Sequence, residues 1–165
     1  MTKHVYLIAL GSNQRHPQHG APRAVLAAAA ARIGRKLGRV RAMAPVIETD
    51  PVGPSLRRYA NSALLLECDL APRKCLRKLL EIEARFGRVR RGQRWRSRVL
   101  DLDIVLWSGG IVAQPGLLIP HPLFRTRDFV LGPAAKVAPR WRDPVTGLSL
   151  THLHARLTRP RRLPR

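Results

Sequence analysis

The run VLDLDIVLW (residues 99–107) limits the possible folds of this chain more than any other segment. Its apolar residues alternate with the carboxylates Asp101 and Asp103, and a period of two is typical of a β-strand. Both aspartates would point to one side of that strand, while the apolar residues point to the other side and into the core. The core-facing residues would be Leu100, Leu102, Ile104 and Leu106. The run therefore predicts a half-buried strand with a polar face.

The residues before this run predict the remaining elements of a sheet. Apolar runs and turn residues give strands at 5–13, 40–49 and 59–68, and helices at 22–36 and 72–86. The order strand–helix–strand–strand–helix–strand is that of the split βαβ unit, a ferredoxin-like α+β fold. We expect an antiparallel sheet with both helices on one face and the other face left for a site.

The later part of the chain carries weaker signals. The segment IVA (111–113) is a possible short strand, followed by a proline-rich turn and a short helix, and a weak helix is expected near 149–157. With 165 residues the chain is expected to form one domain. Residues 140–165 would be a basic C-terminal extension of that domain, packed or partly disordered.

The charge balance indicates an anionic partner. The chain has 31 lysine and arginine residues against 10 acidic residues, a net charge of +21, and 26 of the 31 are arginine. The planar guanidinium group suits phosphate. A nucleic acid and a small polyphosphate both fit this composition.

Six of these arginines lie in the eleven residues 88–98, together with Trp95. This density suits a clamp over a polyphosphate, although a solvated basic loop or a nucleic-acid surface has the same composition. The aspartates that follow favour the polyphosphate, because two neighbouring carboxylates repel each other and a phosphate backbone unless a cation lies between them. Magnesium is the natural cation. The alternative is that arginines of the loop neutralise Asp101 and Asp103.

Other residues offer possible ligand contacts. Glu83 interrupts the apolar stripe of the helix 72–86, so it needs a partner, either an arginine or a ligand donor such as a ribose hydroxyl. His121 lies between two prolines on what we expect to be a rigid turn. Asn61 and Tyr59 share a strand face and, with Phe129, could hold a flat heterocycle.

The two cysteines, Cys68 and Cys75, lack metal-ligand spacing and are expected to be buried or idle thiols in a reducing compartment. No signal peptide or membrane span is evident in the sequence. We therefore expect a cytoplasmic protein.

Several segments, in this order, resemble one enzyme family. They are ALGSN, YANSALLLE, GRVRRGQRW, RVLDLDIVLW, IPHP and RDFVL. Together they cover about residues 5–139 and resemble 6-hydroxymethyl-7,8-dihydropterin pyrophosphokinase, an enzyme of folate biosynthesis. The resemblance implies a ferredoxin-like fold and the transfer of pyrophosphate from ATP to the pterin hydroxymethyl group, with release of AMP. It also implies that residues 1–139 are the catalytic part.

The resemblance assigns roles to individual residues. Two magnesium ions would be held by Asp101 and Asp103, and the transferring group would be stabilised by Arg88 and Arg98. The ATP-binding positions would be Glu83, Arg90, Arg94, Ile104, His121 and Arg127. The pterin-binding positions would be Thr49, Pro51, Val52, Tyr59, Asn61, Trp95 and Phe129.

Some positions depart from the family pattern, and two alternatives stay open. Gly116, Leu118 and Pro122 lack side-chain donors that some relatives use on ATP, which affects nucleotide affinity. The resemblance implies that the partners are the two small substrates, with no nucleic acid and no membrane. It also implies that the protein is a monomer. The alternatives are a basic ferredoxin-like module that binds single-stranded RNA without catalysis, and a family member that has lost activity.

Overall fold

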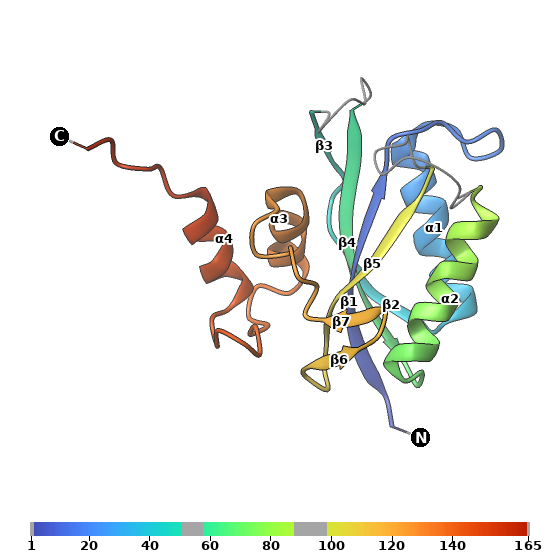
Figure 1. Ribbon diagram of the computed structural model, residues 1–165. Coiled ribbons are helices and arrows are strands. Elements are labelled where there is room, and N and C mark those ends of the chain that lie inside the picture. Colours follow the sequence, from blue (N-terminus) through green and yellow to red (C-terminus); the bar gives the residue numbers. More distant parts are fainter. Residues whose placement is uncertain (1, 51–57, 88–98, 165) are drawn as a thin grey trace.

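The computed structural model describes residues 2–50, 58–87 and 99–164. Its main sheet is antiparallel, with four strands in the order β2-β4-β1-β5 and a fifth, β3, paired with β4 (Figure 1). The strands are β1 (His4–Ser12), β2 (Arg39–Met43), β3 (Ile47–Thr49), β4 (Tyr59–Cys68) and β5 (Asp101–Trp107). The predicted strands are present, and the strand predicted at 40–49 is interrupted around Pro45, as expected for a residue without an N–H donor.

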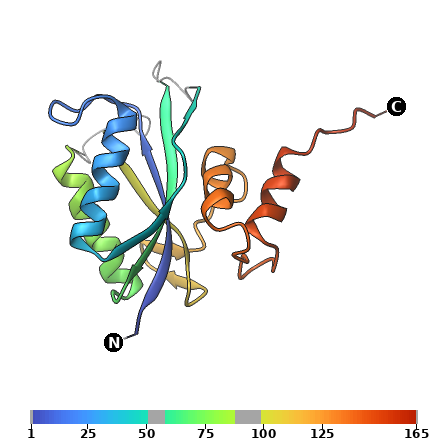
Figure 2. The ribbon, with the colours of Figure 1, turned by 180° about the vertical axis from the view of Figure 1, so that it is seen from behind.

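Helices α1 (Pro22–Lys36) and α2 (Pro72–Arg85) lie together on one face of this sheet (Figures 1 and 2). Each helix has a proline in its first turn, where the missing N–H has no intrahelical partner to lose. The sheet face beneath them is built from large apolar side chains that are almost fully buried. These include Tyr6, Ile8, Leu10, Leu64, Leu66, Leu102 and Ile104.

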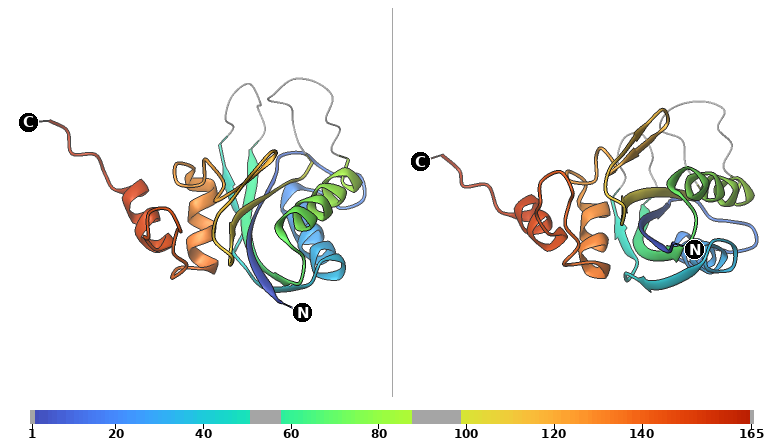
Figure 3. Two further views of the ribbon diagram at one scale, coloured as in Figure 1. Left: turned by 60° about the horizontal axis from the view of Figure 1, so that its bottom comes forward. Right: turned by 90° about the horizontal axis from the view of Figure 1, so that it is seen from below.

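The opposite face of the sheet is not left free, in contrast to the prediction. Helix α3 (Asp128–Val137) packs against β4 on that face, and α4 (Leu150–Thr158) lies behind α3 (Figure 3). The physical reason is that one part of this face is apolar and needs cover. Leu7, Ala63 and Leu106 are buried there in a second core with residues of α3 and α4.

A β-bulge changes the side-chain alternation of β5. Leu7 pairs with Leu106 and Ile8 pairs with Ile104, so Val105 is an extra residue in β5. As a result Leu106 is buried, as predicted, but in the core beneath α3 and not in the core beneath α1 and α2, so the face predicted for this residue was wrong. The carbonyl of Val105 accepts a hydrogen bond from the backbone N–H of His121 at 3.0 Å.

After β5 the chain forms a small separate hairpin of β6 (Val112–Gln114) and β7 (Leu117–Ile119). Gly116 in its turn has φ +73°, a conformation that favours glycine. The chain then passes through a cis peptide bond at Pro120 into the turn that carries His121.

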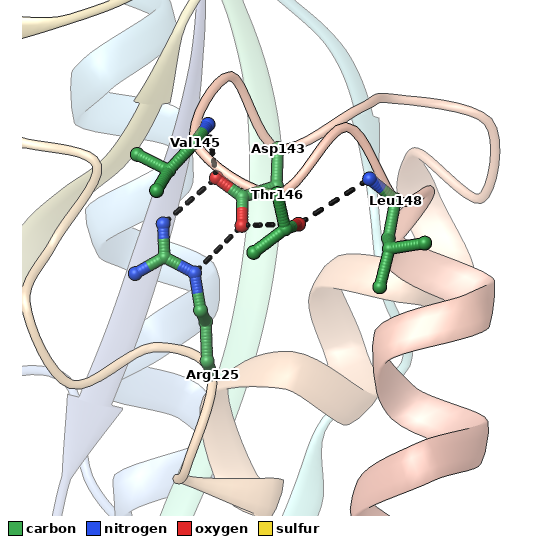
Figure 4. Close-up of polar contacts among 5 residues, drawn as sticks. All are labelled: Arg125, Asp143, Val145, Thr146 and Leu148. Atoms are coloured by element: carbon green, nitrogen blue, oxygen red, sulfur yellow. Dashed lines mark hydrogen bonds and ion pairs between the residues drawn. The ribbon is translucent and has the colours of Figure 1, made fainter.

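The segment between α3 and α4 is anchored by a buried ion pair (Figure 4). The fully buried Asp143 carboxylate accepts hydrogen bonds from Arg125 Nε at 2.6 Å and Arg125 Nη2 at 2.7 Å. It also accepts bonds from the backbone N–H of Val145 and the hydroxyl of Thr146. Burial by itself raises the pKa of Asp143, but these donors outweigh it and lower the pKa to about 2.

Both cysteines are buried, as predicted. None of the helices in the described part of the chain combines the length and the apolar character that a membrane span requires.

Candidate active site

Two rows of residues run across the sheet on the face that α3 partly covers. In the first row Asn61 of β4 pairs with Gly11 of β1, and Gly11 pairs with Asp101 of β5. In the second row Ala9 of β1 lies between Ala63 and Asp103. Paired residues of an antiparallel ladder point to the same face. The two carboxylates therefore share a face, as the alternation predicted, and the central strand beside them carries only a glycine and an alanine.

Gly11 has a steric reason to be glycine. A Cβ atom at this position would lie 3.2 Å from the Oδ1 atom of Asn61, closer than ordinary van der Waals contact. The amide of Asn61 is oriented by a hydrogen bond of 3.1 Å from its Nδ2 to Thr49 Oγ1. Tyr59, two residues before Asn61, pairs with Thr49 across β3 and β4. Three of the predicted pterin-binding residues are thus neighbours on one face.

Glu83 contacts the strand between the two aspartates. Its side chain is only 1% exposed, and its Oε1 atom accepts the backbone N–H of Leu102 at 2.7 Å. Because β5 is the last strand in the order of the sheet, this N–H needs an acceptor from outside the ladder. Glu83 therefore ties α2 to the segment that carries Asp101 and Asp103, a partner that the sequence did not reveal.

His121 lies close to two other predicted site residues. Its Nδ1 atom accepts the backbone N–H of Leu123 at 3.2 Å, so the neutral ring carries its proton on Nε2. Burial lowers the pKa of His121, the positive charge of Arg127 lowers it further, and the carboxylate of Asp101 opposes both effects. The charges of Arg127 and Asp101 therefore both act on the His121 ring.

A cavity of about 390 Å³ opens beside Asp103. Ile104 and His121, both predicted nucleotide positions, line it. The rest of its wall consists of Leu76, Gln114, Gly116, Leu117, Leu118 and Pro122. The lining is mostly apolar, with a carboxylate and an imidazole, and this composition suits a heterocyclic base linked to a charged group.

Sequence reasoning missed Leu76, Gln114 and Leu117 as site residues. Leu76 was assigned to the apolar stripe of its helix, and the other two lie in a hairpin of two three-residue strands. No local signal distinguishes such residues from core residues, because the cavity wall forms only when α2 and the hairpin meet.

Arg127 and Phe129 flank the start of α3. The guanidinium carbon of Arg127 lies 5.8 Å from the centre of the Phe129 ring, within the range of a cation–π contact. Phe129 is half-buried in the first turn of α3, which packs on β4. Phe129 thus belongs to the helix that lies on the same side of the sheet as Asn61.

Comparison with known proteins decides the family. The family model "7,8-dihydro-6-hydroxymethylpterin-pyrophosphokinase (HPPK)" matches residues 7–139. The chain belongs to this family. Over 145 residues it is 39% identical to the pyrophosphokinase of Pseudomonas aeruginosa, covering 87% of this chain and 86% of that protein. Over 134 residues it is 37% identical to that of Methylorubrum extorquens, covering 80% and 81%.

Other HPPK relatives are longer than this chain. The chain is 41% identical over 101 residues to the pyrophosphokinase of Synechocystis but spans only 51% of that protein's length. Among solved structures, the wild-type HPPK-DHPS of Plasmodium falciparum is similar with a TM-score of 0.67 at 12% identity. That match covers 94% of this chain and 44% of the Plasmodium chain, and it shows the fold alone.

Several residues expected to function in an HPPK chain lie outside the described residues. Those in the range 88–98 are Arg88, Arg90, Arg94, Trp95 and Arg98, and those in the range 51–57 are Pro51 and Val52. Their roles stay predictions.

The donor set of the described HPPK site suits magnesium bound together with phosphate. Among the described residues, no group of three or more His, Cys, Asp and Glu side chains could hold a metal ion. A magnesium ion commonly takes only one or two carboxylates and completes its shell with water and phosphate oxygens. Asp101 and Asp103 on one strand face meet that requirement.

Proposed function

We propose that this chain transfers the pyrophosphate group of ATP to the hydroxymethyl group of 6-hydroxymethyl-7,8-dihydropterin, giving AMP and the pterin diphosphate in folate biosynthesis. The observation that carries the proposal is the juxtaposition of a base-sized cavity with Asp101 and Asp103. Membership of the pyrophosphokinase family supports it. Residues 1–139 would be the catalytic part.

The nucleotide would bind with its base in the cavity beside Ile104. Asp103 lines the same cavity, so a base bound there directs its triphosphate toward the acidic face of β5. His121 would donate its Nε2 proton to a phosphate oxygen, because its Nδ1 atom is already an acceptor for Leu123. Arg127 would add a fixed positive charge.

Asp101 and Asp103 would hold two magnesium ions, which neutralise charge on the triphosphate and lower the pKa of the attacking alcohol. The protein's own contribution is to keep both carboxylates on one face of a rigid strand. The hydrogen bond from Leu102 to Glu83 fixes that strand from its outer side. Positioning and charge neutralisation supply most of the catalysis in phosphoryl transfer.

The pterin would bind on the sheet face that carries Asp101 and Asp103, which is the face not covered by α1 and α2. Asn61, oriented by Thr49, offers an amide edge for hydrogen bonding to a heterocycle. Tyr59 and Phe129 would be its aromatic walls, with Pro51, Val52 and Trp95 completing the pocket. The small residues Ala9 and Gly11 lie between this pocket and the carboxylates, so the two substrates meet over β1.

The arginines of residues 88–98 would act on the transferring group. Arg88 and Arg98 would stabilise its developing charge, and Arg90 and Arg94 would contact ATP.

The proposal is tested by release of AMP from ATP and magnesium, with and without the reduced hydroxymethylpterin. We expect AMP only when all three are present. Leu76→Trp fills the cavity and should raise KM for ATP at least about tenfold. Leu80→Trp is the matched control, since Leu80 is a half-buried leucine of the same helix that does not line the cavity.

Two results would count against the proposal. Equal KM values for ATP in Leu76→Trp and wild type would show that ATP does not bind in this cavity. Absence of AMP together with RNA binding that survives Asp101→Ala and Asp103→Ala would favour the RNA-binding alternative.

We also propose that the enzyme acts as a monomer in the cytoplasm. Sedimentation velocity at micromolar concentration tests the oligomeric state, and a dimer would contradict it.

A further inference from the structure

We propose that Arg73 is a positioning residue that sets the affinity for ATP by holding the β6–β7 hairpin against α2. This inference rests on the proposed function of the 390 Å³ cavity as the nucleotide site. Arg73 does not line that cavity, and it would act only through the hairpin that does.

The cavity lies between α2 and a hairpin whose Leu117 and Ile119 are buried in the main core, while residues 113–116 around its turn are exposed. Helix α2 contributes Leu76, and the hairpin contributes Gln114, Gly116, Leu117 and Leu118. The two hairpin strands have three residues each and form a separate two-stranded sheet. A hairpin of this size is marginally stable by itself. Its distance from α2, and so the width of the cavity, depends on contacts with the rest of the protein.

Arg73 makes such a contact at the tip of the hairpin. Its Nη2 atom donates to the side-chain Oε1 of Gln114 at 3.1 Å and to the backbone carbonyl of Pro115 at 2.9 Å. Arg73 precedes Leu76 by three residues on α2, a spacing that places both side chains on the same side of the helix. One side of α2 therefore carries both the cavity wall and the contact that holds the opposite wall.

A second cavity borders the hairpin next to Arg73 itself. This cavity has a volume of about 380 Å³ and is lined by Pro72, Arg73, Trp107 and the hairpin residues Val112 and Ala113, among others. Gln114 lines both cavities. Gln114 therefore borders open space in two cavities, and a shift of the exposed hairpin turn away from α2 would widen the nucleotide cavity.

The decisive experiment compares steady-state kinetics of wild type and Arg73→Ala. We expect KM for ATP to rise about five- to tenfold, with kcat and KM for the pterin within about twofold, since the acidic face and the pterin face are untouched. Arg77→Ala is the matched control, because Arg77 is an exposed arginine one turn further along α2. Circular dichroism of each variant at the assay temperature verifies that it is folded.

Three further measurements separate positioning of the hairpin from a general loss of structure. Inhibition by inorganic tripolyphosphate, which lacks a base, should be the same in Arg73→Ala and wild type. Gln114→Ala should raise KM for ATP only about twofold, because the bond to the Pro115 carbonyl remains. Arg73→Lys should recover part of the affinity, since an ammonium group can still donate to that carbonyl.

The outcomes distinguish this inference from the proposed function. If Leu76→Trp weakens ATP binding but Arg73→Ala does not, the role of Arg73 is refuted and the nucleotide cavity stands. If neither variant changes KM for ATP, the proposed site itself is wrong. A parallel loss of tripolyphosphate inhibition and pterin binding in Arg73→Ala would show a structural defect and would also overturn the inference.

Discussion

The two faces of the central sheet differ most clearly along β1. On the face beneath α1 and α2 the strand presents Tyr6, Ile8 and Leu10, each at most 2% exposed. On the opposite face it presents Leu7, Ala9 and Gly11, so side-chain size decreases along the strand. One face is therefore built for packing throughout its length. The opposite face is apolar and packed at Leu7, but a few residues later it borders polar side chains. Asp101 and Asn61 pair with Gly11 there, and Asp103 pairs with Ala9.

The largest effect is expected from a substitution at Asp103, on the sheet face that α3 partly covers. Asp103→Ala should lower kcat about 10³-fold, equivalent to ~4 kcal/mol of barrier, because under the proposed function Asp103 would hold magnesium. The free energy of unfolding should change by less than about 1 kcal/mol, since removing one of two neighbouring carboxylates also removes repulsion.

Asp69→Ala serves as its control, because Asp69 is exposed and remote from β5 in the sequence. Kinetics and urea unfolding of both variants make the check. A large loss of stability in Asp103→Ala would show that this carboxylate is structural.

The first face should respond in the opposite way. Leu64→Ala removes a fully buried side chain from the core beneath α1 and α2 and should lower the free energy of unfolding by about 3 kcal/mol. At a temperature where the variant is folded, both KM values should be close to those of wild type. Leu163→Ala, at an 89% exposed leucine, should change neither quantity.

The cover of the second face has its own anchor, the Arg125–Asp143 pair. Asp143→Asn should cost about 2 kcal/mol at pH 7, because it leaves the Arg125 guanidinium without its charged partner. The pKa of Asp143 is about 2 in the folded protein and 3.8 without perturbation, so its contribution to stability is complete above about pH 5, falls below pH 3.8 and is lost as pH falls through about 2.

Thermal unfolding as a function of pH checks this prediction. The difference in Tm between wild type and Asp143→Asn should be constant above about pH 5 and should shrink below pH 3.8. A difference that stays constant down to pH 2 would contradict it.

The smallest expected effect lies at the boundary between packing and chemistry. Gly11→Ala places a Cβ atom 3.2 Å from Asn61 Oδ1, so the amide must move by a few tenths of an ångström. We expect KM for the pterin to rise roughly fivefold, about 1 kcal/mol, with KM for ATP unchanged. Gly34→Ala, where the new Cβ meets only Val40 at 3.7 Å, is the control. Equal KM values for the pterin in wild type and Gly11→Ala would indicate that Asn61 does not bind the pterin.

Much of this arrangement could be predicted because it is encoded locally. The alternation in β5 predicted the shared face of Asp101 and Asp103, and proline at the start of α1 and α2 marked both helices. Position 106 could not be predicted, because the bulge at Val105 depends on how β5 pairs with β1.

By itself the sequence determined the strands, the main helices, the acidic face of β5 and the family, since periodicity and motif spacing are properties of neighbouring residues. Only the tertiary structure decided where α3 lies, what Glu83 contacts and which residues enclose the cavity. These contacts join segments far apart in the chain, for example Arg73 with Pro115, and their existence depends on the packing of whole elements. Local pattern specifies which side of an element is apolar, and packing in three dimensions specifies what that side meets.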